Sequence, residues 1–205
     1  MSAGLLSSAK MLVFDFDGTL VDSNRIKQRA FETCFAGPEF AGRRAEILSY
    51  CAGHHHTPRG EKFRHVYEGI LGRPYTPEAE KRLHDCFERE TTAEIIRAPE
   101  IPGASEFLAE VRASHRTAVL SSTPHPILLT ILERRGWAGR FDRIQGAPVD
   151  KAEWLRQLQA RGLSMDQILF FGDSPEDAQS AQKAGCRFLK VPDFREFLHG
   201  RRRAR

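Results

Sequence analysis

Short apolar runs alternate with amphipathic segments over most of the chain. The first run, Met11-Leu12-Val13-Phe14, is unbroken, which is typical of a strand buried on both faces of a parallel sheet. After residue 99, further strands are expected at 117–120, 141–145, 167–171 and 187–191. Helical patterns separate them at 104–114, 126–135, 151–161 and 175–184. Strands that alternate with helices predict βα units, so we expect an α/β fold with a parallel sheet.

Residues 22–98 show helical patterns without a convincing strand. Apolar residues recur at i, i+3, i+4, i+7 and i+8 along Phe63, Val66, Tyr67, Ile70 and Leu71, which predicts one buried helix face. Further helices are expected at 23–35 and 39–50, and another begins at 76–78. The stretch 53–62 has two glycines and a proline and is expected to be a loop.

The change of pattern predicts two domains. Residues 99–103 contain two prolines and a glycine, which favours an extended linker. We therefore expect an α/β core formed by residues 1–21 and 99–205, with an all-helical insertion at 22–98. Residues 1–9 are expected to be a loose leader.

Polar side chains follow three of the predicted strands directly. Asp15 and Asp17 end the first strand and point to the same side, because residues i and i+2 do so in a strand. Ser121 and Asp173 follow two later strands. Ligands of open α/β sheets bind beyond the carboxyl ends of the strands. Two adjacent carboxylates repel unless a cation or a shared proton accompanies them, although a turn with solvated acids is the alternative.

Composition and charge restrict the function classes. With 205 residues, 40% of them hydrophobic and 28% charged, the chain is typical of a soluble globular protein. It has no apolar run of roughly 18–20 residues for a membrane span and no secretory signal pattern. The four cysteines lack a C-x-x-C pair, so we expect reduced thiols and a cytoplasmic location.

The net charge of +4 would mildly steer anionic substrates to the protein. Part of this charge lies in the basic tail, residues 201–205. Such a tail either contacts nucleic acid or is a solvated terminus. Since the chain has no zinc-finger spacing and no aromatic-basic RNA motif, we expect no nucleic-acid partner.

Four motifs together resemble the haloacid dehalogenase superfamily. Residues 11–20, MLVFDFDGTL, are similar to its first motif, and Ser121 matches the second. Lys151 matches the third, and residues 172–177, GDSPED, match the fourth. The second and third are weak alone, since strand-end serines and helix-surface lysines are common. The fourth matches its form well, although helix-capping acids such as Asp177 are also common. The helical insertion resembles the C1-type cap of the phosphoglycolate phosphatase-like and β-phosphoglucomutase-like subgroup. The resemblance implies a Rossmann-like core with an inserted C1 cap.

The resemblance also implies roles for individual residues. Asp15 would be the nucleophile and Asp17 the acid/base, with a pKa raised from about 3.9. Mg²⁺ would be held by Asp15, by the backbone carbonyl of Asp17 and by Asp173, since a hard cation takes oxygen ligands. Asp177 would act on the metal through water or orient Lys151. The groups expected to hold the phosphoryl oxygens are Ser121, Ser122, Lys151, Gly18 and Thr19.

The expected activity is Mg²⁺-dependent hydrolysis of a small phosphomonoester through an aspartyl-phosphate. The alternatives are a sugar-phosphate mutase and a non-catalytic binding protein of the same fold. Arg59 and Lys62 are candidates for binding an anionic substrate, unless they are solvated loop charges. Arg25 is a weaker candidate of the same kind. Residues 54–56, three histidines, form either a metal site or a solvated surface. The substrate and the oligomeric state remain open.

Overall fold

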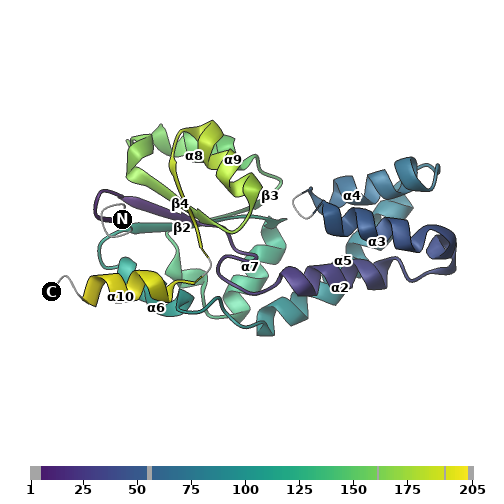
Figure 1. Cartoon of the computed structure of the whole chain (residues 1–205), viewed down its shortest axis with the longest axis horizontal. Coiled ribbons are helices and arrows are strands. Elements are labelled where there is room, and N and C mark those ends of the chain that lie inside the picture. Colours follow the sequence, from purple (N-terminus) through teal and green to yellow (C-terminus); the bar gives the residue numbers. More distant parts are fainter. Residues whose placement is uncertain (1–5, 55–56, 161, 192, 203–205) are drawn as a thin grey trace. The chain divides into compact units, whose positions relative to one another are not determined.

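The chain forms two compact units (Figure 1). A computed structural model describes residues 6–54, 57–160, 162–191 and 193–202. One unit extends to Asp22 and resumes at Ala98, and the other is Ser23–Arg97. Two interpretations fall partly outside the described residues, since these exclude His55 and His56 of the histidine run and residues 203–205 of the basic tail.

The first unit is built on a five-stranded parallel sheet, as the sequence pattern predicted. The strand order is β3-β2-β1-β4-β5. The strands are β1 (Met11–Phe14), β2 (Arg116–Pro124), β3 (Arg143–Ala147), β4 (Ile168–Gly172) and β5 (Arg187–Lys190). Phe14 at the end of β1 is in register with Val119 of β2 and Phe171 of β4. The strand order reverses at β1, so this is the topological switch point where open α/β sheets bind ligands.

Helices cover both faces of the sheet (Figure 1). One face carries α8 (Lys151–Gln159) and α9 (Pro175–Ala184), and the other carries α6 (Ala104–Val111), α7 (His125–Arg134) and α10 (Arg195–Arg202). Short 3₁₀ turns occur at Ala138–Arg140 and Met165–Gln167. Side chains of β1 alternate between the faces. Met11 and Val13 pack with Leu155 of α8, whereas Phe14 joins an aromatic cluster on the opposite face.

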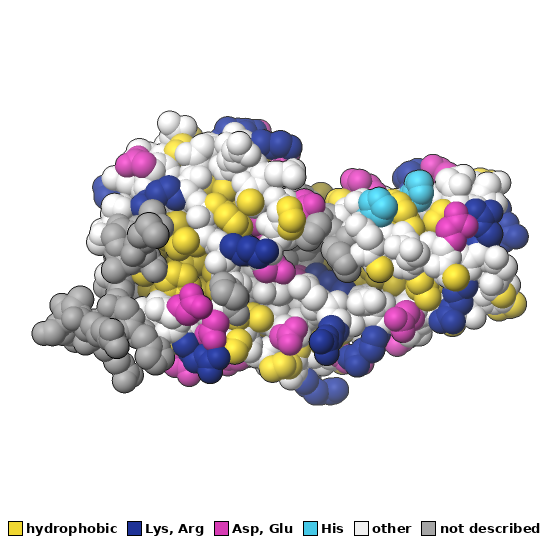
Figure 2. Space-filling model, in the orientation of Figure 1, with side chains coloured by type: hydrophobic (Ala, Val, Ile, Leu, Met, Phe, Trp, Pro, Cys, Tyr) yellow, Lys and Arg dark blue, Asp and Glu magenta, His cyan; other side chains and the backbone are white. Residues whose placement is uncertain are grey.

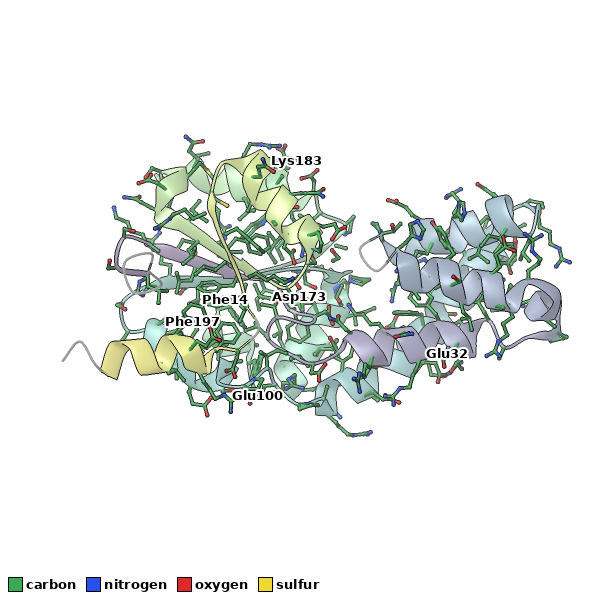
Figure 3. The ribbon with its side chains drawn as sticks, in the orientation of Figure 1. Phe14, Glu32, Glu100, Asp173, Lys183 and Phe197 are labelled. Atoms are coloured by element: carbon green, nitrogen blue, oxygen red, sulfur yellow. The ribbon has the colours of Figure 1, made fainter. Side chains whose placement is uncertain are left out.

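The aromatic cluster connects β1 and β4 to the C-terminal helix (Figure 3). The rings of Phe14 and Phe171 stack with centroids 4.9 Å apart, and Phe107 stacks on Phe194 at 5.1 Å. Phe197 lies 5.9 Å from Phe171. The sequence interpretation assigned no helix here, although an apolar residue at 194 followed by others at 197 and 198 is helical spacing.

The expectation of a loose leader at residues 1–9 is wrong for its described part. Leu6 is buried and its carbonyl accepts hydrogen bonds from Ala9 N and from His115 Nε2. Arg187 donates to the hydroxyl of Ser8. Residues 6–9 are therefore packed onto the first unit.

The second unit consists of helices and short connecting segments, with no strand among its described residues. Its elements are α2 (Asn24–Cys34), η1 (Pro38–Arg43), α3 (Arg44–Gly53), α4 (Arg59–His65), the π-turn η2 (Val66–Ile70) and α5 (Pro77–Arg97). The predicted apolar stripe is buried at Phe63, Val66, Tyr67 and Ile70. The expected loop at 53–62 is shorter than predicted, because α4 already begins at Arg59.

The chain leaves and re-enters the first unit through two paired segments. Val21 and Glu100 form an antiparallel bridge. Asp22 N donates to Pro99 O at 2.9 Å, and Ile101 N donates to Leu20 O at 3.0 Å. The predicted extended linker is thus hydrogen-bonded to the segment that follows the first motif.

Truncating Phe194 should test the aromatic cluster and the docking of α10. Phe194 is fully buried, so Phe194→Ala should lower the free energy of unfolding by about 3–5 kcal/mol. Urea denaturation measures this change. Lys183→Ala on an exposed helix face is the control, with an expected change within about 0.5 kcal/mol. A Phe194→Ala loss no larger than that of the control would contradict the packing described.

Candidate active site

Three carboxylates converge at the carboxyl edge of the sheet, where Figure 3 labels Asp173. Asp15 follows β1, Asp173 follows β4, and Asp177 lies in the first turn of α9. Each contributes one oxygen to a group whose members all lie within 4.8 Å of one another. Asp15 N donates to Phe171 O at 2.8 Å, which extends the pairing of β1 and β4 up to the first carboxylate. The parallel register therefore brings these residues together.

A tight turn follows the first motif. Gly18 has a φ of 79°, a conformation that favours glycine, and its N–H donates to Val21 O at 2.8 Å. Thr19 in this turn is fully buried, and its hydroxyl donates to Asp173 Oδ1 at 3.3 Å. The turn thus connects the first motif to the fourth.

Lys151 joins two of the carboxylates. Its Nζ lies 2.6 Å from Asp15 Oδ1 and 2.7 Å from Asp177 Oδ1. It is the first residue of α8, whose N-cap is Asp150, and the Asp150 carboxylate accepts from Glu153 N at 2.8 Å. Lys151 and its two carboxylate partners are nearly buried. The exposed fraction of the side chain is 12% for Lys151, 8% for Asp15 and 2% for Asp177. Solvent and salt only weakly screen the electrostatic attraction between groups that are buried to this extent.

Burial and charge shift the pKa values of this pair. Burial raises the pKa of Asp15 to about 7, with Lys151 acting against the shift and Asp177 and Asp17 adding to it. Burial lowers the pKa of Lys151, but the carboxylates of Asp15 and Asp177 outweigh burial and hold that pKa above its ordinary value. Lys151 therefore stays cationic, and additional positive charge near Asp15 would favour its ionised form.

Asp17 has a different set of partners from Asp15. Thr123 Oγ1 donates to Asp17 Oδ2 at 2.7 Å, and Ser121 Oγ donates to the same oxygen at 3.4 Å. Ser121 Oγ in turn accepts from Thr123 N at 3.0 Å. The two carboxylates of the first motif thus have different environments. Asp15 contacts an ammonium group, and Asp17 contacts two hydroxyl groups.

The sequence interpretation did not identify Thr123. It ended the second strand at residue 120, whereas β2 continues to Pro124. On this longer strand Ser121 and Thr123 are both buried, while the side chain of Ser122 between them is exposed. The i, i+2 spacing of Ser121 and Thr123 was the available signal.

Ser174 and Gly172 fix the position of Asp177. Ser174 Oγ accepts from Asp177 N at 3.1 Å and Ser174 N donates to Asp177 Oδ2 at 3.3 Å, which forms a capping box. Ser174 Oγ also donates to Asp177 Oδ2 at 2.7 Å. Asp177 Oδ1 contacts Lys151, so both oxygens of this carboxylate have partners. A Cβ on Gly172 would lie 2.5 Å from the Asp177 Cβ, so this position accommodates only glycine without displacement.

The donor set fits a hard divalent cation. Lys151 brings one positive charge to four carboxyl groups, those of Asp15, Asp17, Asp173 and Asp177. Within the described residues, Asp15 Oδ2 makes no hydrogen bond, so it is available to a ligand. Clustered carboxylate oxygens suit Mg²⁺, which takes one or two carboxylates together with waters and phosphate oxygens.

The predicted substrate-binding residues Arg59 and Lys62 lie in α4 of the helical unit. Lys62 is buried, with its Nζ 3.4 Å from Cys51 O and 4.9 Å above the Phe31 ring. The Arg59 guanidinium lies 5.3 Å above the Phe87 ring, and its buried Nε has no hydrogen-bond partner in the described structure. Burial lowers the pKa of both side chains. Their role in binding stays a prediction.

The other candidates from the sequence lie on the surface. Arg25 in α2 is exposed, and His54 contacts Tyr50 O through Nδ1 at 2.8 Å. Basic and acidic side chains are interspersed on the face shown in Figure 2. The net positive charge is therefore not gathered into one patch on that face.

The fold and the site together define a Rossmann-like α/β protein whose polar site lies at the switch point. A family model described as haloacid dehalogenase-like hydrolase matches residues 12–182, and the chain belongs to this family. The family resemblance predicted from the four motifs is confirmed, and the protein is a hydrolase of the haloacid dehalogenase type.

Curated relatives carry a phosphatase name. The chain is 26% identical over 183 residues to a phosphoglycolate phosphatase of Yersinia pseudotuberculosis, covering 85% of this chain and 77% of the relative. It is 28% identical over 178 residues to a phosphoglycolate phosphatase of Synechococcus elongatus, covering 85% and 79%.

A solved structure shares the fold. The chain is similar to CbbY from Rhodobacter sphaeroides, solved in complex with phosphate, with a TM-score of 0.67 and 22% identity over 91% of this chain and 87% of that one. In the described part of this chain, no helix is both long and apolar enough to cross a membrane.

Adding a methyl group at Gly172 should disturb the site through Asp177. Gly172→Ala would overpack a buried contact, so we expect a loss of about 1–3 kcal/mol in the free energy of unfolding together with weakened Mg²⁺ binding. Urea denaturation and metal titration calorimetry measure the two effects. Gly139→Ala is the matched control, because a Cβ there would meet nothing within 4 Å. Unchanged Mg²⁺ binding in Gly172→Ala would contradict the link between Gly172 and the site.

Proposed function

We propose that the protein is a Mg²⁺-dependent phosphatase that acts on a small phosphomonoester through an aspartyl-phosphate. The observation that carries this proposal is that the two carboxylates of the first motif have different hydrogen-bond and charge partners. Asp15 contacts the Lys151 ammonium, whereas Asp17 accepts from the hydroxyls of Thr123 and Ser121. Carboxyl groups in different environments can take the roles of nucleophile and acid/base in one site.

Asp15 is proposed as the nucleophile. Its Oδ2 attacks phosphorus, and the bond between phosphorus and the leaving oxygen breaks as the new bond forms. Lys151 holds Oδ1 of the same carboxylate at 2.6 Å, which restrains rotation of the group and offsets negative charge as the phosphate approaches.

Asp17 is proposed as the general acid and then the general base. In the first step its carboxyl gives a proton to the leaving oxygen, which departs as an alcohol. In the second step it takes a proton from the water that attacks phosphorus, and the bond from phosphorus to Asp15 breaks. Phosphate leaves and both aspartates return to their starting states. Thr123 orients the carboxyl through Oδ2 for both transfers. The Ser121 hydroxyl, 3.4 Å from the same oxygen in this structure, turns to the phosphoryl group when substrate binds.

Hydrogen-bond donors at the carboxyl edge are proposed to hold the phosphoryl oxygens. These donors are the Ser121 hydroxyl, the Lys151 ammonium and the backbone N–H groups of Thr19 and Ser122, with the Gly18 turn shaping the loop. Preorganised donors of this kind stabilise charge that develops in the transition state.

Asp15, Asp173 and the backbone carbonyl of Asp17 are proposed to hold Mg²⁺. When bound, the cation would offset charge between carboxylate and phosphate. Asp177 is proposed mainly to orient Lys151, because its two oxygens contact Lys151 and Ser174.

The relatives and the helical unit support a proposal for the substrate class. Two relatives are named phosphoglycolate phosphatases, and CbbY was solved with phosphate, which supports a small phosphorylated metabolite. We propose that residues 22–98 act as a cap that selects the leaving group and excludes water. Arg59 is the candidate contact for an anionic leaving group, since its Nε is buried without a partner in the described structure. Lys62 is a second candidate.

A panel of phosphomonoesters tests the proposal. Phosphate release would be measured from phosphoglycolate, sugar phosphates, nucleotides and an aryl phosphate, with Mg²⁺ and with EDTA. We expect Mg²⁺-dependent release that Asp15→Asn abolishes, because the amide cannot form the aspartyl-phosphate. Asp166→Asn on the surface is the matched control and should retain full activity.

Two outcomes would contradict the proposal. Release from no ester would exclude the phosphatase reaction for this panel. Equal release by Asp15→Asn would exclude Asp15 as the nucleophile.

Thr123→Val should separate positioning from folding. Valine keeps the shape of threonine but removes the donor to Asp17, so kcat should fall by about 10-fold or more, since general acid–base catalysis contributes roughly 10²–10⁴-fold. The alkaline limb of the pH–rate profile should move to higher pH as well, because Asp17 must be protonated to act as the general acid and its carboxylate loses a donor, while KM stays nearly unchanged. Thr123→Ser should restore activity, and Thr130→Val is the control. A wild-type pH profile in Thr123→Val would refute the positioning role.

A further inference from the structure

Two cysteines of the helical unit lie nearly at bonding distance. Cys34 ends α2 and Cys86 lies within α5, 52 residues apart in sequence, yet their Sγ atoms are 2.7 Å apart. A disulfide bond measures about 2.05 Å, so the gap between the two sulfurs exceeds a bond by only about 0.7 Å. Both residues are free thiols in this structure.

The packing of α2 on α5 holds the sulfurs in place (Figure 1). Phe31 of α2 and Phe87 of α5 contact each other with ring centroids 4.8 Å apart. Both rings belong to the buried core of the helical unit, and so does Cys34. Because well-packed cores resist deformation, the two sulfurs meet without an opening of the unit.

The two thiols differ in accessibility. Cys34 is buried, and burial raises the pKa of its thiol far above the ordinary value, with the hydrogen bond to Cys86 adding to the shift. Cys86 is half-buried. Its partial exposure makes Cys86 the sulfur that a small oxidant reaches first.

We propose that Cys34 and Cys86 form a site of reversible oxidation, at which a small peroxide produces an intramolecular disulfide. The Cys86 thiolate attacks one peroxide oxygen, the O–O bond breaks, and Cys86 becomes a sulfenic acid while hydroxide leaves and is protonated to water. Cys34 sulfur then attacks the Cys86 sulfur. The sulfenic hydroxyl leaves with the Cys34 proton as a second water. Two thiols and hydrogen peroxide thus give one disulfide and two waters.

The disulfide would link the first and last long helices of the helical unit. It closes a loop between residues 52 positions apart, Cys34 and Cys86, and a closed loop of this size restricts the unfolded chain. Oxidation therefore stabilises the helical unit against unfolding. A dithiol reductant reverses the change.

The remaining cysteines supply internal controls. Cys186 belongs to the other unit and is half-buried like Cys86, but it has no thiol neighbour among the described contacts. Cys51 is buried in the helical unit, and burial raises the pKa of its thiol to about 11. Neither is expected to form a bridge.

Thiol counting on the full chain tests the proposal. After treatment with equimolar hydrogen peroxide, the denatured protein should show two reactive thiols instead of four, and the intact mass should fall by two hydrogens. Peptide mapping should recover one linked pair that contains Cys34 and Cys86. The apparent melting temperature should rise, and dithiothreitol should restore both the thiols and the lower melting temperature.

Matched variants assign the roles. Cys34→Ser should accumulate a sulfenic acid at Cys86 that dimedone traps, with no rise in melting temperature. Cys86→Ser should consume peroxide about 10-fold more slowly. Cys186→Ser should still lose two thiols. Four persisting thiols in oxidised wild type, or a bridge that includes Cys51 or Cys186, would overturn the proposal. Since none of these measurements uses enzymatic turnover, they are independent of the proposed phosphatase reaction.

Discussion

The structure of the site depends on repulsion among carboxylates that are buried or partly buried. Asp15, Asp17, Asp173 and Asp177 are gathered where β1 and β4 end, and Lys151 is the ammonium that contacts two of them. Charges removed from water interact strongly, and unbalanced negative charge is costly. This constraint explains why Asp15 is paired with a cation and Asp17 with hydroxyls. It also explains why a bound divalent cation would stabilise the site. The surrounding helices and turns serve to hold this arrangement.

Secondary structure supports the arrangement at three helix or strand ends. The N-terminus of α8 presents Lys151, and the capping box of α9 fixes Asp177. The extension of β2 brings Thr123 to Asp17. In each case the functional side chain lies at the end of an element whose interior is packed in the core. Such placement gives a polar site rigidity without burying polar groups inside the hydrophobic layers.

The sequence predicted most of the sheet and the first and fourth motifs because local rules act there. Unbroken apolar runs marked the strands, and acids one residue apart had to share a face. Thr123 was missed because the strand continues through polar residues, which hydrophobicity cannot mark. Helix α10 was missed because its burial depends on Phe107 and Phe171, which are distant in sequence. The burial of Lys62 could not be predicted from the sequence either. A lysine is buried only where tertiary contacts pack around the aliphatic part of its side chain, as the Phe31 ring does here.

The paired segments at the boundary of the first unit have a consequence for how such a chain can arise and vary. The backbones of Asp22 and Pro99 are joined by one hydrogen bond, so the two ends of the intervening segment start side by side. A tight turn could connect them without altering the strand order. The 75 or so residues between them are topologically a single elongated loop of the sheet. Selection can therefore exchange or reshape that loop while the carboxylates of the first unit keep their geometry.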